Sequence, residues 1–234
     1  MSSRSEDAVT SLKLGSENAI LAQLPAERFT GIIQPHHRPT ADDQDRYRVM
    51  LLVQDCARCS FGADEAGPTH ELHLWLHVGS SAESPPIERA DAMLPSNQWL
   101  ALLAATDNPV VAENLRSFGF DPLRLTSVDL QSSGGALELQ DGTRLGWTTS
   151  GPGRGPATLG VHHAMFMPDD GPSAAGHRVA ALISDAVMAR PGELRVHGSS
   201  LEPYILPGES LPALVHSMPK LEADVLWRLR SRAS

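Results

Sequence analysis

The sequence is poor in positive charge and has no long apolar run. Each of these shortages excludes a class of function. It has 19 Lys and Arg against 28 Asp and Glu, for a net charge of −9. The concentrated basic surface that nucleic acid binding requires is therefore not expected. No apolar run approaches the roughly 20 residues that span a bilayer, and the N-terminus lacks the order of a secretory signal. The sequence predicts a cytoplasmic protein that binds neither nucleic acid nor membrane.

Cysteine is also scarce, with one C-x-x-C pair formed by Cys56 and Cys59. Such a pair occurs in redox sites and as half of a zinc site. No second pair follows it, and no helix start is evident after it. Two reduced thiols on or near a strand are the expectation, and a redox or zinc pair is the alternative.

What the chain does contain is typical of one globular domain. Hydrophobic residues make up 41% and charged residues 20% of its 234 residues, which is enough for a real core. Single β-rich domains often reach this length. We expect residues 1–15 to form a flexible leader and residues 16–234 to form a single domain.

Short β-like runs separated by turn signals dominate the pattern. Gly-rich and Asp-Gly turns divide them, and the glycine-rich segment 151–156 is expected to be a flexible loop. The expected strands are 47–56, 71–78, 99–106, 125–131, 136–139, 144–149, 162–167, 193–197 and 221–229.

Three segments favour helices. Residues 16–25 have Ser16 as a possible N-cap and Pro25 beyond the end, and residues 109–118 and 176–188 have apolar residues at helical spacing. Together with the strands, they predict an α+β chain that is mainly antiparallel, with a few flanking helices.

The segment THELHLWLHV, residues 69–78, concentrates histidine on one expected strand. A zincin helix would need a second histidine where Leu74 stands, so that motif is absent. Alternation along a strand puts the leucines on one face and Glu71, His73, Trp75 and His77 on the other. The leucine face requires a core, and the other face is a candidate site.

A metal site at this strand is an alternative that we do not favour. His73 and His77 lie about 13 Å apart along a strand, so only Glu71 and His73 could share an ion. Two more ligands would have to come from elsewhere, for example His162 or His163. We expect no metal and no cofactor.

The order of several segments resembles the acetoacetate decarboxylase-like family, over about residues 15–230. The resemblance lies in THELHLWLHV, ATDNPVVAENLRSFGFDPLRL, VHHAMFMPDDG and the closing run from residue 192 to residue 227. It implies a closed, cone-like β-structure whose interior holds the active site. Glu71 would match the family's interior glutamate, and Asp55 is the acid nearest to the place of a second interior carboxylate.

The family's chemistry depends on a lysine in an aromatic-Pro-Lys turn, whose neutral amine forms a Schiff base with a ketone. The matching segment here, residues 118–124, contains no lysine. The lysines of the chain are Lys13 and Lys220, and neither suits the role. Arg124 cannot replace the lysine because a guanidinium stays protonated. Schiff-base decarboxylation is therefore not expected.

The remaining residues predict an enzyme that works by general acid/base chemistry on a keto-acid or polyketide-like small molecule. Glu71 and His73 would be the acid/base pair, and Arg124 would hold a carboxylate or enolate oxygen. The reaction would be a cyclisation, dehydration, isomerisation or lyase step in specialised metabolism. Trp75, His77, Phe120 and Asp55 would line the substrate site.

The alternative is a binding protein on a former decarboxylase scaffold, which holds a small molecule or peptide without converting it. By analogy with the family, we also expect a homo-oligomer, since the edges of an antiparallel sheet need covering.

Overall fold

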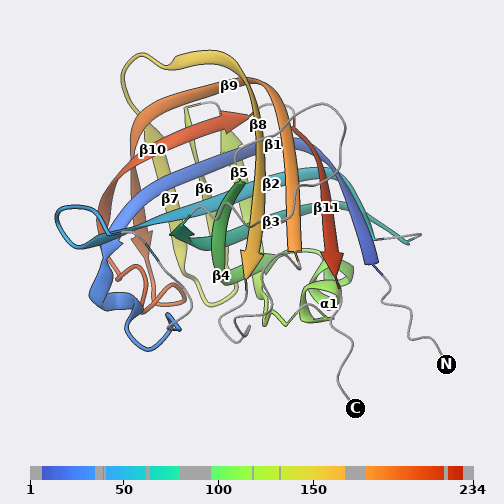
Figure 1. Cartoon of the computed structure of the whole chain (residues 1–234), viewed down its shortest axis with the longest axis horizontal. Helices are drawn as coiled ribbons and strands as arrows, with labels where there is room; N and C mark the ends of the chain where they lie inside the picture. Colours follow the sequence, from blue (N-terminus) through green and yellow to red (C-terminus); the bar gives the residue numbers. More distant parts are fainter. Residues whose placement is uncertain are drawn as a thin grey trace.

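One eleven-stranded sheet forms most of the molecule. The computed structural model describes residues 7–34, 39, 41–61, 64–79, 96–117, 119–131, 133–166, 178–218 and 221–228, and Figure 1 shows their arrangement. The first strands are β1 (Asp7–Pro25), β2 (Arg46–Phe61), β3 (Asp64–Gly79) and β4 (Ser96–Thr106). The middle strands are β5 (Leu123–Gln131), β6 (Gly134–Leu139) and β7 (Arg144–Thr149). The last are β8 (Arg154–Phe166), β9 (Arg178–His197), β10 (Ser210–Met218) and β11 (Leu221–Arg228).

The sheet closes on itself. The strand order is β10-β1-β11-β9-β7-β6-β5-β4-β3-β2, and β2 pairs with β1 to complete the circuit. β8 pairs with β4 and β9, and only the β4–β5 and β4–β8 pairs among the described strands are parallel. The predicted closed, mainly antiparallel β-cone is confirmed. In the described part of the chain, the helices are α1 (Pro109–Ser117) and the short 3-10 helix η1 (Ala26–Phe29).

The helix predicted over residues 16–25 is wrong, because this segment belongs to β1. Ile20, Ala22 and Leu24 alternate with residues of the opposite face, and all three are buried in the core. This period of two fits a strand better than a helix. β1 also begins at Asp7, well inside the segment expected to be a leader.

The helix predicted over residues 176–188 is wrong as well. Its apolar residues belong to β9, which over residues 179–184 is paired with β11 on one edge and with β8 on the other. A short apolar run fits a helix and a strand equally well, and here strand pairing decides between them. The helix predicted at 109–118 is confirmed as α1.

All the expected strands are present, as β2 to β9 and β11, and most of them are longer than predicted. β8 begins at Arg154, within the segment that was expected to be a loop. Sequence analysis missed β10. Among the described residues, no helix is long and apolar enough to cross a membrane.

The main core lies between the β1–β4 part of the sheet and the β5–β7 part. Leu72, Leu74 and Leu76 are fully buried in it, as the alternation in β3 predicts. Trp147 packs over Gly135, where an added Cβ would come within 2.4 Å of the indole ring. A glycine is therefore required at position 135 for this packing.

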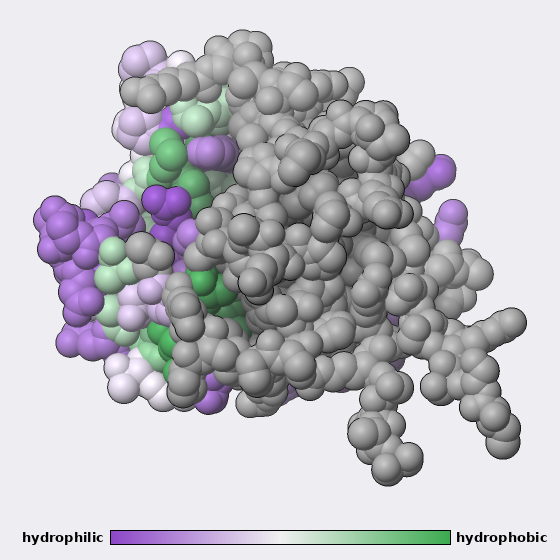
Figure 2. Space-filling model, viewed as in Figure 1, coloured by the Kyte–Doolittle hydropathy of each residue, from purple (hydrophilic) through white to green (hydrophobic). Residues whose placement is uncertain are grey.

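An ion pair fixes η1 to the loop before β10. Arg28 donates two hydrogen bonds to the Glu209 carboxylate, of 2.7 and 2.9 Å, and a third of 2.9 Å to the Tyr204 carbonyl oxygen. In Figure 2, hydrophilic residues cover the outer part of the described surface at the left, where Figure 1 places η1 and the segment before β2.

Candidate active site

A row of polar side chains crosses four strands on the face of β3 opposite to its leucines. Strand register aligns Glu17 of β1 with Gln54 of β2, Gln54 with Glu71 of β3, and Glu71 with Thr106 of β4. Directly paired residues of antiparallel strands project to the same face. These four side chains are 1–5% exposed, so the row is a buried polar cluster and not a solvated surface.

His73 lies beside this row and is bonded to Glu71. Its Nε2 is 2.9 Å from Glu71 Oε2, and the two residues are 7% and 5% exposed. With Glu71 as a carboxylate, Nε2 carries the proton and donates, so Nδ1 is left with its lone pair. Nδ1 is buried and has no hydrogen-bond partner among the described residues. The pair therefore presents an oriented basic nitrogen.

Aromatic rings surround His73. Trp75 lies 5.9 Å from it between ring centroids, and Phe120 lies 6.4 Å away in an edge-to-face arrangement. Trp99 extends the group, with its ring 6.3 Å from Trp75 and 5.1 Å from His77. Burial, and then the charge of Arg48, lower the pKa of His77, which favours its neutral form.

The end of α1 explains how Phe120 reaches His73. Gly119 adopts a left-handed conformation, with φ of 93°, which a glycine tolerates at a helix C-terminus. The amide of Phe120 then bonds back to the Leu115 carbonyl oxygen at 3.0 Å. This turn folds the Phe120 ring inward, where it is 7% exposed.

Glu17 is a site residue that sequence analysis missed. Its Oε2 accepts a hydrogen bond of 2.5 Å from Gln54 Nε2, while its Oε1 is buried without a partner among the described residues. Burial raises its pKa to about 7, although the Gln54 hydrogen bond and the charge of His73 act in the opposite direction. If residues 16–25 had been assigned to a strand, alternation would have placed Glu17 on the face opposite to the core residues. Glu17 could then have been recognised as a candidate site residue.

The two cysteines adjoin the same cluster. Both are free thiols in β2, as predicted, and Cys56 Sγ lies 4.0 Å from Glu71 Oε1. Burial, and then the charge of Glu71, raise both pKa values, that of Cys59 to about 12. Thiols protonated at neutral pH are poor nucleophiles, so these cysteines pack in the cluster as neutral groups.

Two predicted residues lie elsewhere. Asp55 projects to the opposite face of β2 from Gln54, and its Oδ1 is 3.7 Å from His70 Nε2. The position opposite Glu71, where a second interior carboxylate was expected, holds the amide of Gln54. The side chain of Arg124, at the start of β5, is exposed to solvent. The structure thus brings Glu71, His73, Trp75, His77 and Phe120 together, but not Asp55 or Arg124.

Similarity in sequence is not detectable, but similarity in structure is. No family model matches the chain, and no curated protein matches it in sequence. The structure of acetoacetate decarboxylase from Legionella pneumophila aligns with 95% of this chain and 87% of its own, with a TM-score of 0.55 and 9% identity. The chain has the acetoacetate decarboxylase-like fold.

Two further solved structures share this fold. The enduracididine biosynthesis enzyme MppR, in complex with pyruvate, aligns over 94% of this chain and 88% of its own, with a TM-score of 0.51 and 12% identity. An acetoacetate decarboxylase-like enzyme from Sphingomonas wittichii RW1 aligns over 97% and 94%, with a TM-score of 0.51 and 11% identity.

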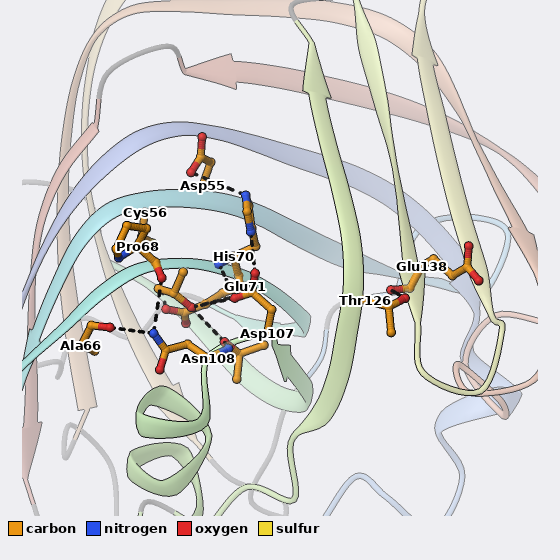
Figure 3. Close-up of polar contacts among 12 residues, drawn as sticks. Asp55, Cys56, Ala66, Pro68, His70, Glu71, Asp107, Asn108, Thr126 and Glu138 are labelled. Carbon is orange, nitrogen blue, oxygen red and sulfur yellow. Dashed lines mark hydrogen bonds and ion pairs between the residues drawn. The ribbon is translucent and has the colours of Figure 1, made fainter.

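Within this acetoacetate decarboxylase-like fold, Asp107 and Asn108, which lie between β4 and α1, bond to both β3 and α1. Figure 3 shows the His70 ring between Asp107 and Asp55, with His70 Nδ1 2.7 Å from Asp107 Oδ2. Asn108 accepts hydrogen bonds from the first amides of α1 and donates to the Ala66 and Pro68 carbonyl oxygens. The motif therefore fixes the start of β3 to the start of α1.

The described residues offer no metal centre, since no group of three or more His, Cys, Asp and Glu among them could hold an ion. The side chains of His162 and His163 lie outside what the structure describes, as does Lys220. The backbone of Lys13 is on β1, opposite Arg58.

A pocket of about 160 Å³ lies where β1, β5, β9 and β10 meet. Asn18, Ser217 and Met188 occupy one cross-strand row along it. Glu17 and Arg190 also line the pocket. The pocket therefore adjoins the buried polar row at its β1 end.

Proposed function

We propose that the protein is a lysine-independent enzyme that removes and returns a proton next to the carbonyl of a small keto-acid or polyketide-like substrate. The observation that supports it best is the His73–Glu71 bond, which leaves the buried Nδ1 of His73 without a partner among the described side chains and free to act as a base. A base of this kind contributes about 10²- to 10⁴-fold to a proton transfer.

The role of each residue follows from its contacts. Glu71 holds the His73 ring in the tautomer with a basic Nδ1 and stabilises the imidazolium that forms, which is the role of the acid in hydrolase triads. Phe120 and Trp75 exclude water and pack against the carbon skeleton of the substrate. His77 and Trp99 extend this apolar wall. Arg124 and Asp55 are left out because their side chains lie away from His73.

The keto-acid class is supported by analogy with one structural neighbour. MppR has been captured with pyruvate, and also with the condensation product of pyruvate and imidazole 4-carboxaldehyde. At 12% identity the likeness extends to the fold alone, so the reaction of this chain has to come from its own residues. Proton abstraction beside a carbonyl is the first step of isomerisation, dehydration and retro-aldol cleavage alike.

Deuterium exchange tests the proposal without knowledge of the final product. The purified full-length protein is incubated in D₂O with pyruvate, 2-oxobutyrate and longer 2-keto acids, and loss of the proton signal next to the carbonyl is followed by NMR. We expect exchange above the buffer rate with at least one compound, and a fall of 100-fold or more in His73→Gln. His70→Gln, on the other face of β3, is the matched control and should exchange normally.

The outcomes separate the two functional hypotheses. Exchange that depends on His73 supports the enzyme. A keto acid that binds, as seen by calorimetry, and shows no exchange in the wild-type protein contradicts it and favours a binding protein on the same scaffold.

A further inference from the structure

We propose that Glu17 is the acid partner of His73, a neutral carboxylic acid that donates a proton to the substrate's carbonyl oxygen. The inference rests on the proposed function and deepens it, because it names a second reacting group and the substrate atom that this group contacts.

The first argument is the state of the Glu17 side chain. It is 1% exposed, and Oε1 has no hydrogen-bond partner among the described residues, while Oε2 is held by Gln54. A buried polar atom without a partner is unfavourable, because it has lost its hydrogen bonds to water. Glu17 Oε1 and His73 Nδ1 are both in this state, and they belong to one cluster. A ligand with a proton donor and an acceptor would satisfy both atoms.

The second argument is the spacing of the two groups. Glu17 and Glu71 are aligned through Gln54, two strand spacings apart, which is about 10 Å between their backbones. His73 lies two residues further along β3, on the same face. Glu17 and His73 therefore project to the same face of the sheet, on either side of Gln54. The charge of His73 acts on the pKa of Glu17, which agrees with this proximity.

The third argument is which carboxylate carries the proton. Glu71 is already engaged by the His73 ring. Glu17 is hydrogen-bonded to the neutral amide of Gln54, and burial raises its pKa to about 7. Among the described residues, the other titratable groups near Glu17 are the Cys56 and Cys59 thiols, whose pKa values are raised, and His216 of β10, whose pKa is lowered by burial. Arg190 lines the same pocket as Glu17. A buried carboxylic acid kept neutral near a basic group is a pattern seen in acid and base catalysis.

The proton transfers balance within the site. His73 Nδ1 takes a proton from the carbon beside the carbonyl, and Glu17 Oε1 gives its proton to the carbonyl oxygen. The C–H bond breaks, an O–H bond forms, and the product is the enol, with an imidazolium and a carboxylate left in the protein. When the imidazolium returns a proton to the same carbon or to a different one, and the enol returns its proton to the carboxylate, His73 and Glu17 are both restored to their starting states. No oxidant or further reactant is required.

A titration tests the acid directly, without substrate. Protein labelled with ¹³C at the glutamate carboxyl carbons is titrated from pH 4 to pH 9 by NMR. We expect one carboxyl signal with a midpoint near 7 that is absent from Glu17→Gln. The signal should persist in Glu138→Gln, the matched control, whose carboxylate is bonded to Arg144 at the surface. The inference is overturned when every glutamate titrates below about pH 5.5, or when the signal survives in Glu17→Gln.

The rate of deuterium exchange then tests the role. For the wild type we expect kcat/KM to fall above pH 7, where Glu17 loses its proton. In Glu17→Gln the rate should drop about 100-fold and this alkaline fall should vanish, because glutamine donates a hydrogen bond at every pH but transfers no proton. A buried residue with a purely structural role would leave the shape of the profile unchanged.

Failure of this inference differs from failure of the proposed function. If exchange depends on His73 but its pH profile is unchanged in Glu17→Gln, the acid role of Glu17 is rejected. The role of His73 as the base still stands. If the wild-type protein shows no exchange, the proposed function is rejected. The carboxyl titration would still show whether Glu17 is protonated near neutral pH.

Discussion

His70 and His73 lie three residues apart on β3, yet their rings are on opposite faces and each is bonded to a different acid. His70 Nδ1 is 2.7 Å from Asp107 Oδ2 in a site that is about one third exposed, and His73 Nε2 is 2.9 Å from Glu71 Oε2 in a buried one. The strand's alternation separates them. The sequence itself therefore supplies an internal control for each experiment on His73.

The tautomer of His73 is the first prediction. Because Glu71 accepts from Nε2, the neutral ring should carry its proton on Nε2, and long-range ¹H–¹⁵N NMR should identify Nδ1 as the unprotonated nitrogen. In Glu71→Gln this preference should weaken, since an amide can donate as well as accept. A protonated Nδ1 in the wild-type protein at pH 8 would contradict the proposed base.

The pH dependence of stability is the second prediction. The folded pKa of Glu17 is raised from 4.5 to about 7, so the folded protein binds more protons than the unfolded chain between these values. The free energy of unfolding should therefore fall as the pH rises from about 4.5 to about 7, by about 3 kcal/mol from this group. Urea unfolding should show that the free energy of unfolding of Glu17→Gln rises relative to that of the wild type as the pH increases over this window. A constant difference would be the contrary result.

The leucine face of β3 gives the third prediction. Leu74 is fully buried in the core, whereas Leu214 on β10 is 40% exposed. Leu74→Ala should lower the free energy of unfolding by about 2–5 kcal/mol because it removes packed atoms and leaves a cavity. Leu214→Ala, the control, should cost less than about 1 kcal/mol. Chemical denaturation measures both, and equal losses would contradict the assignment of the core face.

The Arg28–Glu209 pair gives the fourth prediction. Both side chains are at most 20% exposed, so Glu209→Gln should cost about 1–3 kcal/mol. Although burial alone would raise it, hydrogen bonds from Arg28 and the Leu206 amide lower the pKa of Glu209. This stabilisation is therefore present above pH 4.5 and is lost as the pH falls through the lowered pKa. Glu193→Gln, in the exposed pair with Arg195, should cost under about 1 kcal/mol.

The cap of α1 gives the fifth prediction. Asn108→Ala removes both the N-cap and the bonds to the start of β3, and it should cost about 1–2 kcal/mol. Asn114→Ala, in the middle of the same helix, should have a smaller effect. Hydrogen exchange should speed up at the amides of Val110 and Val111, which Asn108 accepts from. Unchanged exchange there would show that the cap contributes little.

The sequence was informative where alternation was strong and ambiguous where apolar runs were short. In β3 the leucines alternate with polar residues, so both faces could be predicted, along with Glu71 and His73. In β1 the capping signals of Ser16 and Pro25 imitated a helix, and this error concealed Glu17. In β9 the apolar residues before and after Ser184 and Asp185 fell at helical spacing by chance, and so short a run does not distinguish strand from helix.

The composition of the site depended on register, which local patterns do not encode. Asp55 and Gln54 are neighbours in sequence, and only the pairing of β2 with β3 decides which of them stands opposite Glu71. Phe120 was identified through resemblance to a family motif, and its approach to His73 depends on the turn at Gly119. A residue pattern alone could not have supplied either contact.

β1 changes partners next to Glu17. Residues up to Leu14 pair with β11, and residues from Glu17 onward pair with β10. Both partners come from the far end of the chain, so this edge of β1 gains its neighbours only after nearly all of the sequence has been synthesised. β1 and β2, by contrast, can pair early as near neighbours in sequence. The environment that raises the pKa of Glu17 therefore depends on pairing between the two ends of the described chain.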